Sequence, residues 1–171
     1  MSVTVDEVDA EAAVPWYRRG RTLDVVGLLA RLLLGVVLVW AGAAKVGHPL
    51  TSQRAVQAYQ IFPFELAGWI GLALPFLEIV VGVLLLLGLF TRPAAVVGAL
   101  LMLAFIAGIA QAWARGLSID CGCFGGGGEI APSATRYPEE IARDTGFALA
   151  GGWLAWRPRS LASLDRILFG H

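Results

Sequence analysis

Residues 23–44 read LDVVGLLARLLLGVVLVWAGAA, a stretch in which only Asp24 and Arg31 carry charge. As an α-helix this stretch is about 33 Å long, enough to cross the hydrocarbon core of a bilayer, which is about 30 Å thick. A signal peptide behind the basic residues 18–21 is the alternative, but the apolar stretch is long for one and contains an arginine. We therefore expect the first membrane span here.

The composition extends this interpretation to the whole chain. Of its 171 residues, 57 % are hydrophobic and 15 % charged, and the mean hydropathy is +0.71, whereas soluble domains average about 45–50 % apolar and about 25 % charged residues. Lys and Arg together number 13, as do Asp and Glu, so no net charge favours a nucleic acid or another polyanion. We expect a membrane protein whose first partner is lipid and which binds no nucleic acid.

Three further apolar blocks follow the first. Residues 66–90 and 94–113 are separated only by residues 91–93 and predict a helical hairpin, and residues 141–156 form a shorter block whose first turn carries charge. We expect four spans in an all-α, polytopic membrane four-helix bundle with short interfacial helices. A re-entrant segment in place of the fourth span is the alternative.

The chain ends and the orientation follow from charge. Residues 1–20 predict a disordered acidic tail with a basic interface segment, residues 21–157 a four-span domain, and residues 158–171 an amphipathic cytoplasmic tail. Lys and Arg near the span ends number seven on the side of both termini and five on the other side. The positive-inside rule then predicts a bacterial inner-membrane protein with cytoplasmic termini and an extracytoplasmic loop after the third span.

Charges inside the spans are costly and therefore point to function. Along the first helix, one stripe at helical spacing combines charged and small residues: Asp24, Arg31, Gly35, Gly42 and Lys45.

Glu78 is the corresponding charge of the second span, on a stripe with Gly71, Pro75 and Gly82. Counting helical rise from the inner surface places Arg31 about 12 Å deep and Glu78 about 18 Å deep, so we predict an Arg31–Glu78 pair. Such a pair either fixes the register of two helices or takes part in proton or substrate handling, and both readings stay open here.

The loop after the third span contains Cys121-Gly122-Cys123, the two cysteines of the chain. A disulfide across one glycine would be strained and easily reduced, so the pair suits electron exchange better than stabilisation. Inert thiols, a structural clip and half of a metal site completed by His48 or Asp120 are the alternatives. We favour redox exchange and expect no metal, because few soft ligands are present.

Neighbouring side chains would tune these thiols. Asp120 would raise the pKa of the attacking cysteine, whereas basic residues would lower it. Phe124 adjoins the pair and is expected to affect the rate of attack. The basic residues in question are Lys45, Arg115, Arg136 and Arg143.

Residues 120–125, DCGCFG, resemble the signature of MauE-type membrane proteins within the DoxX-like group. Residues 31–35 and 41–45 resemble the first-helix pattern of that family, and residues 74–78 resemble the second. The resemblance extends from about residue 23 to about residue 156. It implies a four-helix bundle associated with thiol–disulfide chemistry in the cell envelope, the MauE type being linked to maturation of a periplasmic methylamine dehydrogenase with many disulfides. The acidic tail and the basic C-terminal segment depart from the pattern, so only the redox class is carried over.

These observations predict a membrane protein whose Cys121 and Cys123 exchange electrons with an extracytoplasmic thioredoxin-like or substrate protein. Since the chain has no other cysteine, a quinone or a partner subunit would be the second electron station, with Arg31, Lys45 and Glu78 as candidate quinone-site residues. The rivals are a non-catalytic anchor or assembly subunit of an envelope redox complex and a small-solute transporter. Glycine-rich helix faces also leave a homodimer open.

Overall fold

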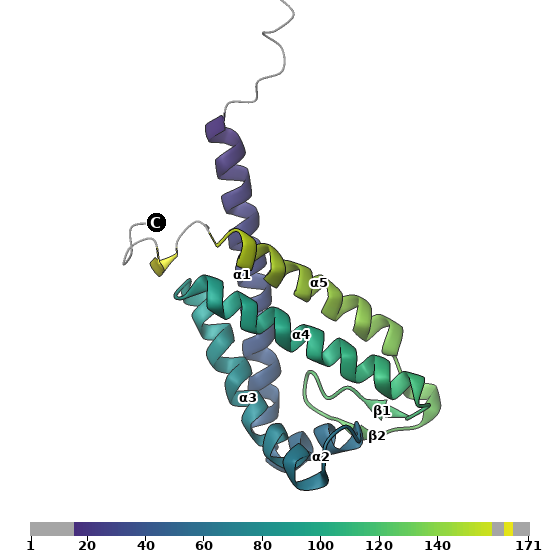
Figure 1. Ribbon diagram of the computed structural model, residues 1–171. Coiled ribbons are helices and arrows are strands. Elements are labelled where there is room, and N and C mark those ends of the chain that lie inside the picture. The colour runs from purple at the N-terminus through teal and green to yellow at the C-terminus, as the bar shows by residue number, and fades with distance from the viewer. Residues whose placement is uncertain (1–15, 159–162, 166–171) are drawn as a thin grey trace, which may run out of the picture.

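The computed structural model describes residues 16–158 and 163–165, and this part of the chain is mainly helical (Figure 1). Its long helices are α1 (Trp16–Val46), α3 (Phe64–Leu87), α4 (Thr91–Ala114) and α5 (Tyr137–Trp156). A short helix, α2 (Pro49–Ala58), joins α1 to α3. Between α4 and α5 lie an antiparallel pair of short strands, β1 (Ile119–Asp120) and β2 (Gly128–Glu129), and a 3-10 turn, η2 (Pro132–Ala134). The predicted all-α class is confirmed.

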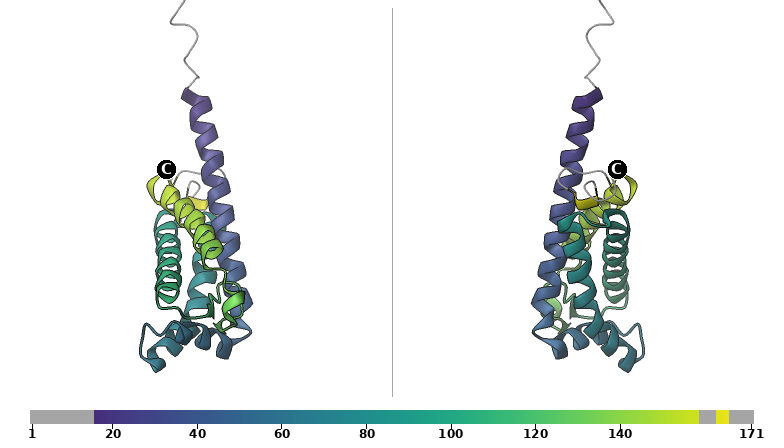
Figure 2. Two further views of the ribbon diagram at one scale, coloured as in Figure 1. Left: turned by 90° about the vertical axis from the view of Figure 1, so that its right-hand side faces the viewer. Right: turned by 90° about the vertical axis from the view of Figure 1, so that its left-hand side faces the viewer.

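The long helices run alternately up and down, so the bundle has two distinct ends (Figures 1 and 2). At one, which we call the loop end, α2 and the β1–β2 loop lie together. At the other, the turn end, residues 163–165 lie beside the connection from α3 to α4, because the backbone N–H of Asp165 donates to the Gly88 carbonyl at 2.9 Å. The cysteines and residues 163–165 therefore occupy opposite ends.

The connection between α3 and α4 is a tight turn over residues 88–90, three residues earlier than the turn expected at 91–93. Gly88 ends α3 in the left-handed conformation, with φ of 65°, and the N–H of Leu89 bonds to the Leu84 carbonyl at 3.0 Å, as in a Schellman cap. Pro93 instead sits in the first turn of α4, where a missing backbone N–H costs no hydrogen bond.

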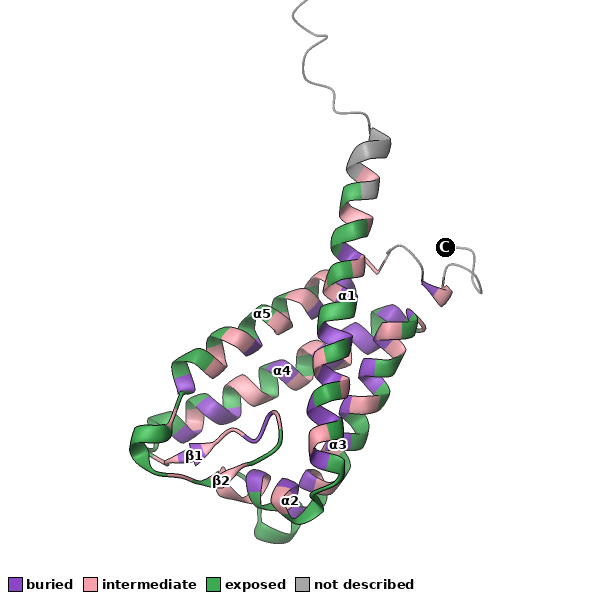
Figure 3. Cartoon of the chain, turned by 180° about the vertical axis from the view of Figure 1, so that it is seen from behind, coloured by how far each residue is buried: buried purple, intermediate pink, exposed green. Residues whose placement is uncertain are grey.

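Three of the described helices contain segments long and apolar enough to cross a membrane, namely residues 22–46, 64–87 and 91–114. Large apolar side chains cover the outer surface of the bundle, which Figure 3 shows largely as exposed. Examples are Leu33, Trp40, Trp69, Phe76, Leu100 and Leu149. The chain is thus a multi-pass membrane protein in contact with lipid.

Helix α5 covers the predicted fourth span and is 20 residues long, but it is less apolar than the other three, since four charged residues lie in its first two turns. It runs beside α4 (Figure 1), and Phe147, Ala148 and Leu154 join the core cluster with α4. Four membrane crossings therefore stay a prediction. The predicted acidic tail and most of the predicted C-terminal surface helix lie in residues 1–15, 159–162 and 166–171, outside the described residues.

Glycines set the packing of α1 against α3. A Cβ on Gly82 would lie 2.8 Å from the Gly35 carbonyl oxygen, and a Cβ on Gly42 would lie 2.6 Å from the Pro75 carbonyl oxygen. Both contacts are too close for any side chain, so the two helix backbones touch at these levels. The small residues that left a homodimer open are thus used inside the chain, and the contacts fix which residues of α1 and α3 face each other.

Candidate functional site

The Cys-bearing loop is closed by β1–β2 and packs against α2 at the loop end. Gly122 and Gly127 have positive φ, 66° and 108°, and both approach Ala55 of α2 so closely that a Cβ on either would collide with it. Glycine is the residue that adopts such backbone angles without strain. The glycines therefore let the loop rest on α2 and fix the position of the two thiols.

Cys121 and Cys123 are free thiols on this loop, in different surroundings. Cys121 is half-buried, whereas Cys123 is only 5 % exposed. The backbone N–H of Cys123 donates to the Cys121 Sγ at 3.3 Å, and the Cys123 thiol lies 4.0 Å from the Cys121 carbonyl oxygen. The Cys-Gly-Cys turn thus folds back so that the second cysteine supports the sulfur of the first.

These contacts separate the acidities of the two thiols. The Cys123 thiol and backbone N–H lower the pKa of Cys121, with help from Arg143 and against the effects of burial and of the Glu140 charge. The proximity of Cys121, and then burial, raise the pKa of Cys123. The thiolate therefore forms first on Cys121, the more exposed sulfur, and Cys123 stays protonated beside it.

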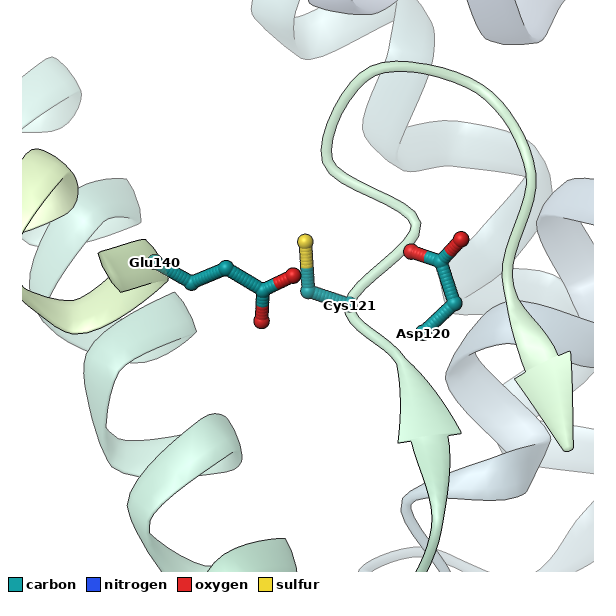
Figure 4. A group of neighbouring side chains, drawn as sticks. All are labelled: Asp120, Cys121 and Glu140. Atoms are coloured by element: carbon teal, nitrogen blue, oxygen red, sulfur yellow. The ribbon is translucent and has the colours of Figure 1, made fainter. Parts of the chain in front are cut away.

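Two charged residues of α5 approach Cys121. Glu140 points its carboxylate toward the thiol (Figure 4), and burial raises the pKa of this carboxyl. Arg143 lies 4.7 Å above the centre of the Phe124 ring and pairs with Asp144 at 3.0 Å. A carboxylate that can accept a proton and a cation that stabilises a thiolate thus both lie near the reactive sulfur.

The other residues predicted to support the thiols act on the shape of the site. Asp120 accepts a hydrogen bond from the Gly122 N–H at 3.0 Å and so shapes the turn. Phe124 packs on Trp40 of α1, ring centres 5.8 Å apart. Arg115 donates to the carbonyl oxygens of residues 59 and 60, at 3.4 and 3.3 Å, and braces the segment between α2 and α3.

A pocket of about 160 Å³ opens beside the thiols, between α2, α3 and α4. Its walls are mainly apolar, and both cysteines line it. Lys45 contributes the charged group of the wall, and the Tyr59 side chain, whose hydroxyl donates to the Cys121 carbonyl at 3.1 Å, lines it as well. The main apolar contributors are Ile61, Phe62, Ile70, Leu74, Leu101 and Phe105.

The predicted Arg31–Glu78 pair is wrong. Glu78 is fully buried and instead accepts two hydrogen bonds from the Lys45 ammonium, at 2.6 and 2.9 Å. The depth estimate assumed that both helices start at one membrane plane, but the contacts of Gly35 with Gly82 fix a different register. In that register Lys45 reaches Glu78, since side chains on both helices lean toward their own N-termini.

Arg31 lies at the turn end, far from the pocket. Its guanidinium packs directly against Gly88, where a Cβ would overlap it. Asp165 accepts hydrogen bonds from the N–H groups of Phe90 and Thr91, at 2.7 and 2.8 Å. Burial opposes the shift, but these bonds and the charge of Arg31 together lower the pKa of Asp165. Of the candidate quinone-site residues, the structure brings Lys45 and Glu78 together and leaves Arg31 elsewhere.

Sequence reasoning missed Tyr59 and Glu140. Glu140 lies three residues before Arg143, so both fall on one face of α5, and charges at the start of an apolar helix were the available signal. Of these charges, Arg143 alone is assigned to the thiols from the sequence, as one of the basic residues expected to lower the pKa of the attacking cysteine. Tyr59, the other missed residue, follows α2, and its hydroxyl donates a hydrogen bond to the Cys121 carbonyl. No motif around it in the sequence indicates that it belongs to the site.

Asp120, Cys121 and Glu140 bring one donor atom each within 4.8 Å of one another, so they are the described residues best placed to approach a cation. The set offers a single sulfur, and one Asp120 oxygen already accepts the Gly122 N–H. His48, the other suggested ligand, is exposed at the start of α2 and is no member of the group. The arrangement suits thiol chemistry better than metal binding.

The chain is similar to known proteins over most of its length. The family model described as methylamine utilisation protein MauE matches residues 23–157. A protein of this name from Paracoccus denitrificans is 35 % identical over 98 residues, 57 % of this chain and 53 % of that protein, so the match spans about half of the relative's length. A second, from Methylorubrum extorquens, is 35 % identical over 133 residues, 77 % of this chain and 69 % of that protein. No solved structure shows a significant match.

Proposed function

The chain belongs to the MauE family, and we propose that it acts there as a membrane thiol–disulfide exchange protein. In this proposal Cys121 and Cys123 form one redox unit that exchanges an electron pair with a thioredoxin-like or substrate protein outside the cytoplasm. The relatives are named methylamine utilization proteins, so an envelope protein of a methylamine-using system is the partner that family membership favours.

The observation that carries the proposal is the unequal environment of two free thiols on one glycine turn. Exchange needs one sulfur that attacks as a thiolate and a second that waits as a thiol within reach. Cys121 is the more exposed and has the lowered pKa, and Cys123 is buried behind it with a raised pKa. An inert pair or a structural clip does not require this division.

The division assigns an order to the two cysteines. The Cys121 thiolate attacks a disulfide of the partner, so that a mixed disulfide forms and one partner sulfur leaves as a thiolate. The Cys123 thiol then loses its proton and attacks the Cys121 sulfur. An internal disulfide forms, and the second partner sulfur is released. One partner disulfide becomes a dithiol as the dithiol of this chain becomes a disulfide, and the reverse sequence runs the electrons the other way.

Glu140 and Arg143 support these steps by acting on the Cys121 sulfur. Glu140 lies beside the Cys121 thiol (Figure 4) with a raised pKa, so its carboxylate is suited to accept the proton that a thiol must lose. Arg143 offers positive charge to the thiolate, and its stacking on Phe124 holds it in place.

We further propose that both termini are cytoplasmic and that the loop end faces out of the inner membrane, following the arginine bias. In intact cells, Cys121 should then react with a membrane-impermeant maleimide after mild reduction. Labelling that appears only after the cells are lysed would reverse this orientation.

The rival function is a non-catalytic subunit that anchors or assembles an envelope redox complex. Replacing both cysteines by serine separates the two functions, because serine keeps the shape of the loop but has no thiol. We expect the double variant to be made at normal levels and to lose partner oxidation or reduction in cells. Full activity of the double variant would favour the anchoring subunit.

A further inference from the structure

The thiol pair needs a second electron station, and the chain has no thiol to provide it. Cys121 and Cys123 are its two cysteines, so an electron pair taken from one protein cannot pass to another sulfur of this chain. The station must therefore come to the pair from solution or from the lipid. This step rests on the proposed function.

The pocket beside the thiols has the size and polarity for an uncharged ring. Its volume is about 160 Å³, and an apolar protein cavity of roughly 150 Å³ binds benzene. The wall is mainly apolar and includes two leucines, two isoleucines and two phenylalanines, and both cysteines belong to it. A ring held there would contact the redox pair directly.

The charge of Lys45 favours an apolar ligand that carries a carbonyl oxygen over a plain hydrocarbon chain. Its ammonium is held by both oxygens of Glu78, lies 5.5 Å from the centre of the Phe105 ring, and lines the pocket. A hydrocarbon chain would gain nothing from a cation in the wall. A carbonyl oxygen that becomes negatively charged during reduction would be stabilised there, since a fixed cation in an apolar site interacts strongly with developing charge.

The pocket is also reachable from the bilayer. Helices α3 and α4 diverge from their shared turn toward the loop end (Figure 1), and the pocket lies between them. Ile61 and Phe62, which line it, are 49 % and 46 % exposed, and Ala104 in its α4 wall is exposed as well. A lipid-soluble ligand can enter sideways with its tail left among the acyl chains.

We propose that this pocket binds the ring of a membrane quinone, which takes the electron pair from Cys121 and Cys123. The two thiols lose two electrons and two protons and form a disulfide, and the quinone gains two electrons and two protons and becomes a quinol. Lys45 stabilises the quinone oxygen as it gains charge. The disulfide then oxidises the next partner dithiol, so the net reaction makes a partner disulfide and a quinol.

The test uses the full chain in detergent, reduced and freed of excess reductant, with ubiquinone-1 as the probe under anaerobic conditions. Quinone absorbance and maleimide labelling of the cysteines are followed together. We expect one quinone to be reduced for each protein, both thiols to be lost together, and the rate to saturate as the quinone concentration rises.

Ala104→Trp tests whether the quinone binds in this pocket. The indole would fill the pocket, and we expect it to lower the rate of quinone reduction about tenfold or more. Ala107→Trp is the matched control, an exposed alanine one turn along α4 that does not line the pocket. It should leave the rate unchanged, and thermal melting checks that both variants fold.

Glutathione disulfide, added in place of quinone, distinguishes the two proposals. If it oxidises the thiol pair while ubiquinone-1 does not, or if quinone reduction is unsaturable and equal in both tryptophan variants, the quinone site is wrong and the exchange function stands. If neither oxidant converts the pair to a disulfide, the exchange function falls as well.

Discussion

Helix α1 carries two buried cations, Arg31 and Lys45, which are 1 % and 6 % exposed and about 21 Å apart along the helix. Arg31 lies at the turn end beside Gly88 and residues 163–165. Lys45 is enclosed at the loop end by Glu78, but it also lines a pocket that contains both thiols. Within the described residues, the first cation packs against the α3–α4 turn, whereas the second also faces a pocket that can hold a ligand.

This difference teaches that a buried charge in a membrane helix identifies a functional site only together with what opens beside it. By sequence, the two cations look alike, since they share one stripe of α1. The comparison assigns stability to the turn end and chemistry, as well as stability, to the loop end. Substitutions at each end test that assignment.

The largest expected effect is at Lys45. Lys45→Met leaves the fully buried Glu78 carboxylate without its partner, and breaking a buried pair in this way costs about 3–5 kcal/mol. The double variant Lys45→Met/Glu78→Gln removes both charges and should recover most of that loss. Thermal unfolding in detergent measures both. Additive losses from the two single changes would show that the pair is not coupled.

At the turn end, Gly88→Ala should destabilise the fold by about 1–3 kcal/mol, because alanine is strained at positive φ and its methyl would overlap Arg31. Gly116→Ala is the matched control, with φ of 68° and nothing near the added methyl. It should show only the smaller conformational cost. Thiol labelling rates should stay unchanged in both variants, and a change in Gly88→Ala alone would link the two ends.

Asp165→Ala should cost about 0.5–2 kcal/mol, the usual effect of losing a helix cap, because the N–H groups of Phe90 and Thr91 lose their acceptor. The folded pKa of Asp165 is lowered, so its contribution is present above the unfolded value of about 3.9 and is lost as the pH falls through the folded pKa. Melting temperatures of the wild-type and variant proteins should therefore converge in acid. A difference that grows in acid would contradict the cap.

The smallest expected effect is at Arg143. Arg143→Gln removes a cation that helps lower the pKa of Cys121, so the pH profile of Cys121 alkylation should shift upward and the rate at neutral pH should fall a few-fold. Arg136→Gln is the control, because Arg136 pairs with Glu139 at the surface. Equal pH profiles of Cys121 alkylation in the two variants would show that Arg143 does not act on Cys121.

The sequence predicted the helical class and the Cys loop because both depend on local patterns. Long apolar blocks specify membrane helices, and two cysteines on one glycine are visible without a fold. The order of the thiols was not predictable, because it depends on the N–H of Cys123 pointing back at Cys121 and on charged residues of α5.

The partner of Glu78 was missed because it depends on helix register. The spacing from Gly35 to Gly42 equals that from Pro75 to Gly82, and antiparallel pairing of these small residues brings Lys45, not Arg31, to Glu78. That equal spacing was the available signal. The pocket is different, since it arises where α2, α3, α4 and the Cys loop meet and no single segment encodes it.

The central claim, that Cys121 attacks and Cys123 resolves, is tested most directly by reacting purified full-length variants with a small fluorescent disulfide. We predict that Cys123→Ser keeps a covalent fluorescent adduct and that Cys121→Ser reacts at least about tenfold more slowly. The wild type should form its internal disulfide and retain no adduct. Equal adduct on both single variants, or a stable adduct on the wild type, would contradict the claim.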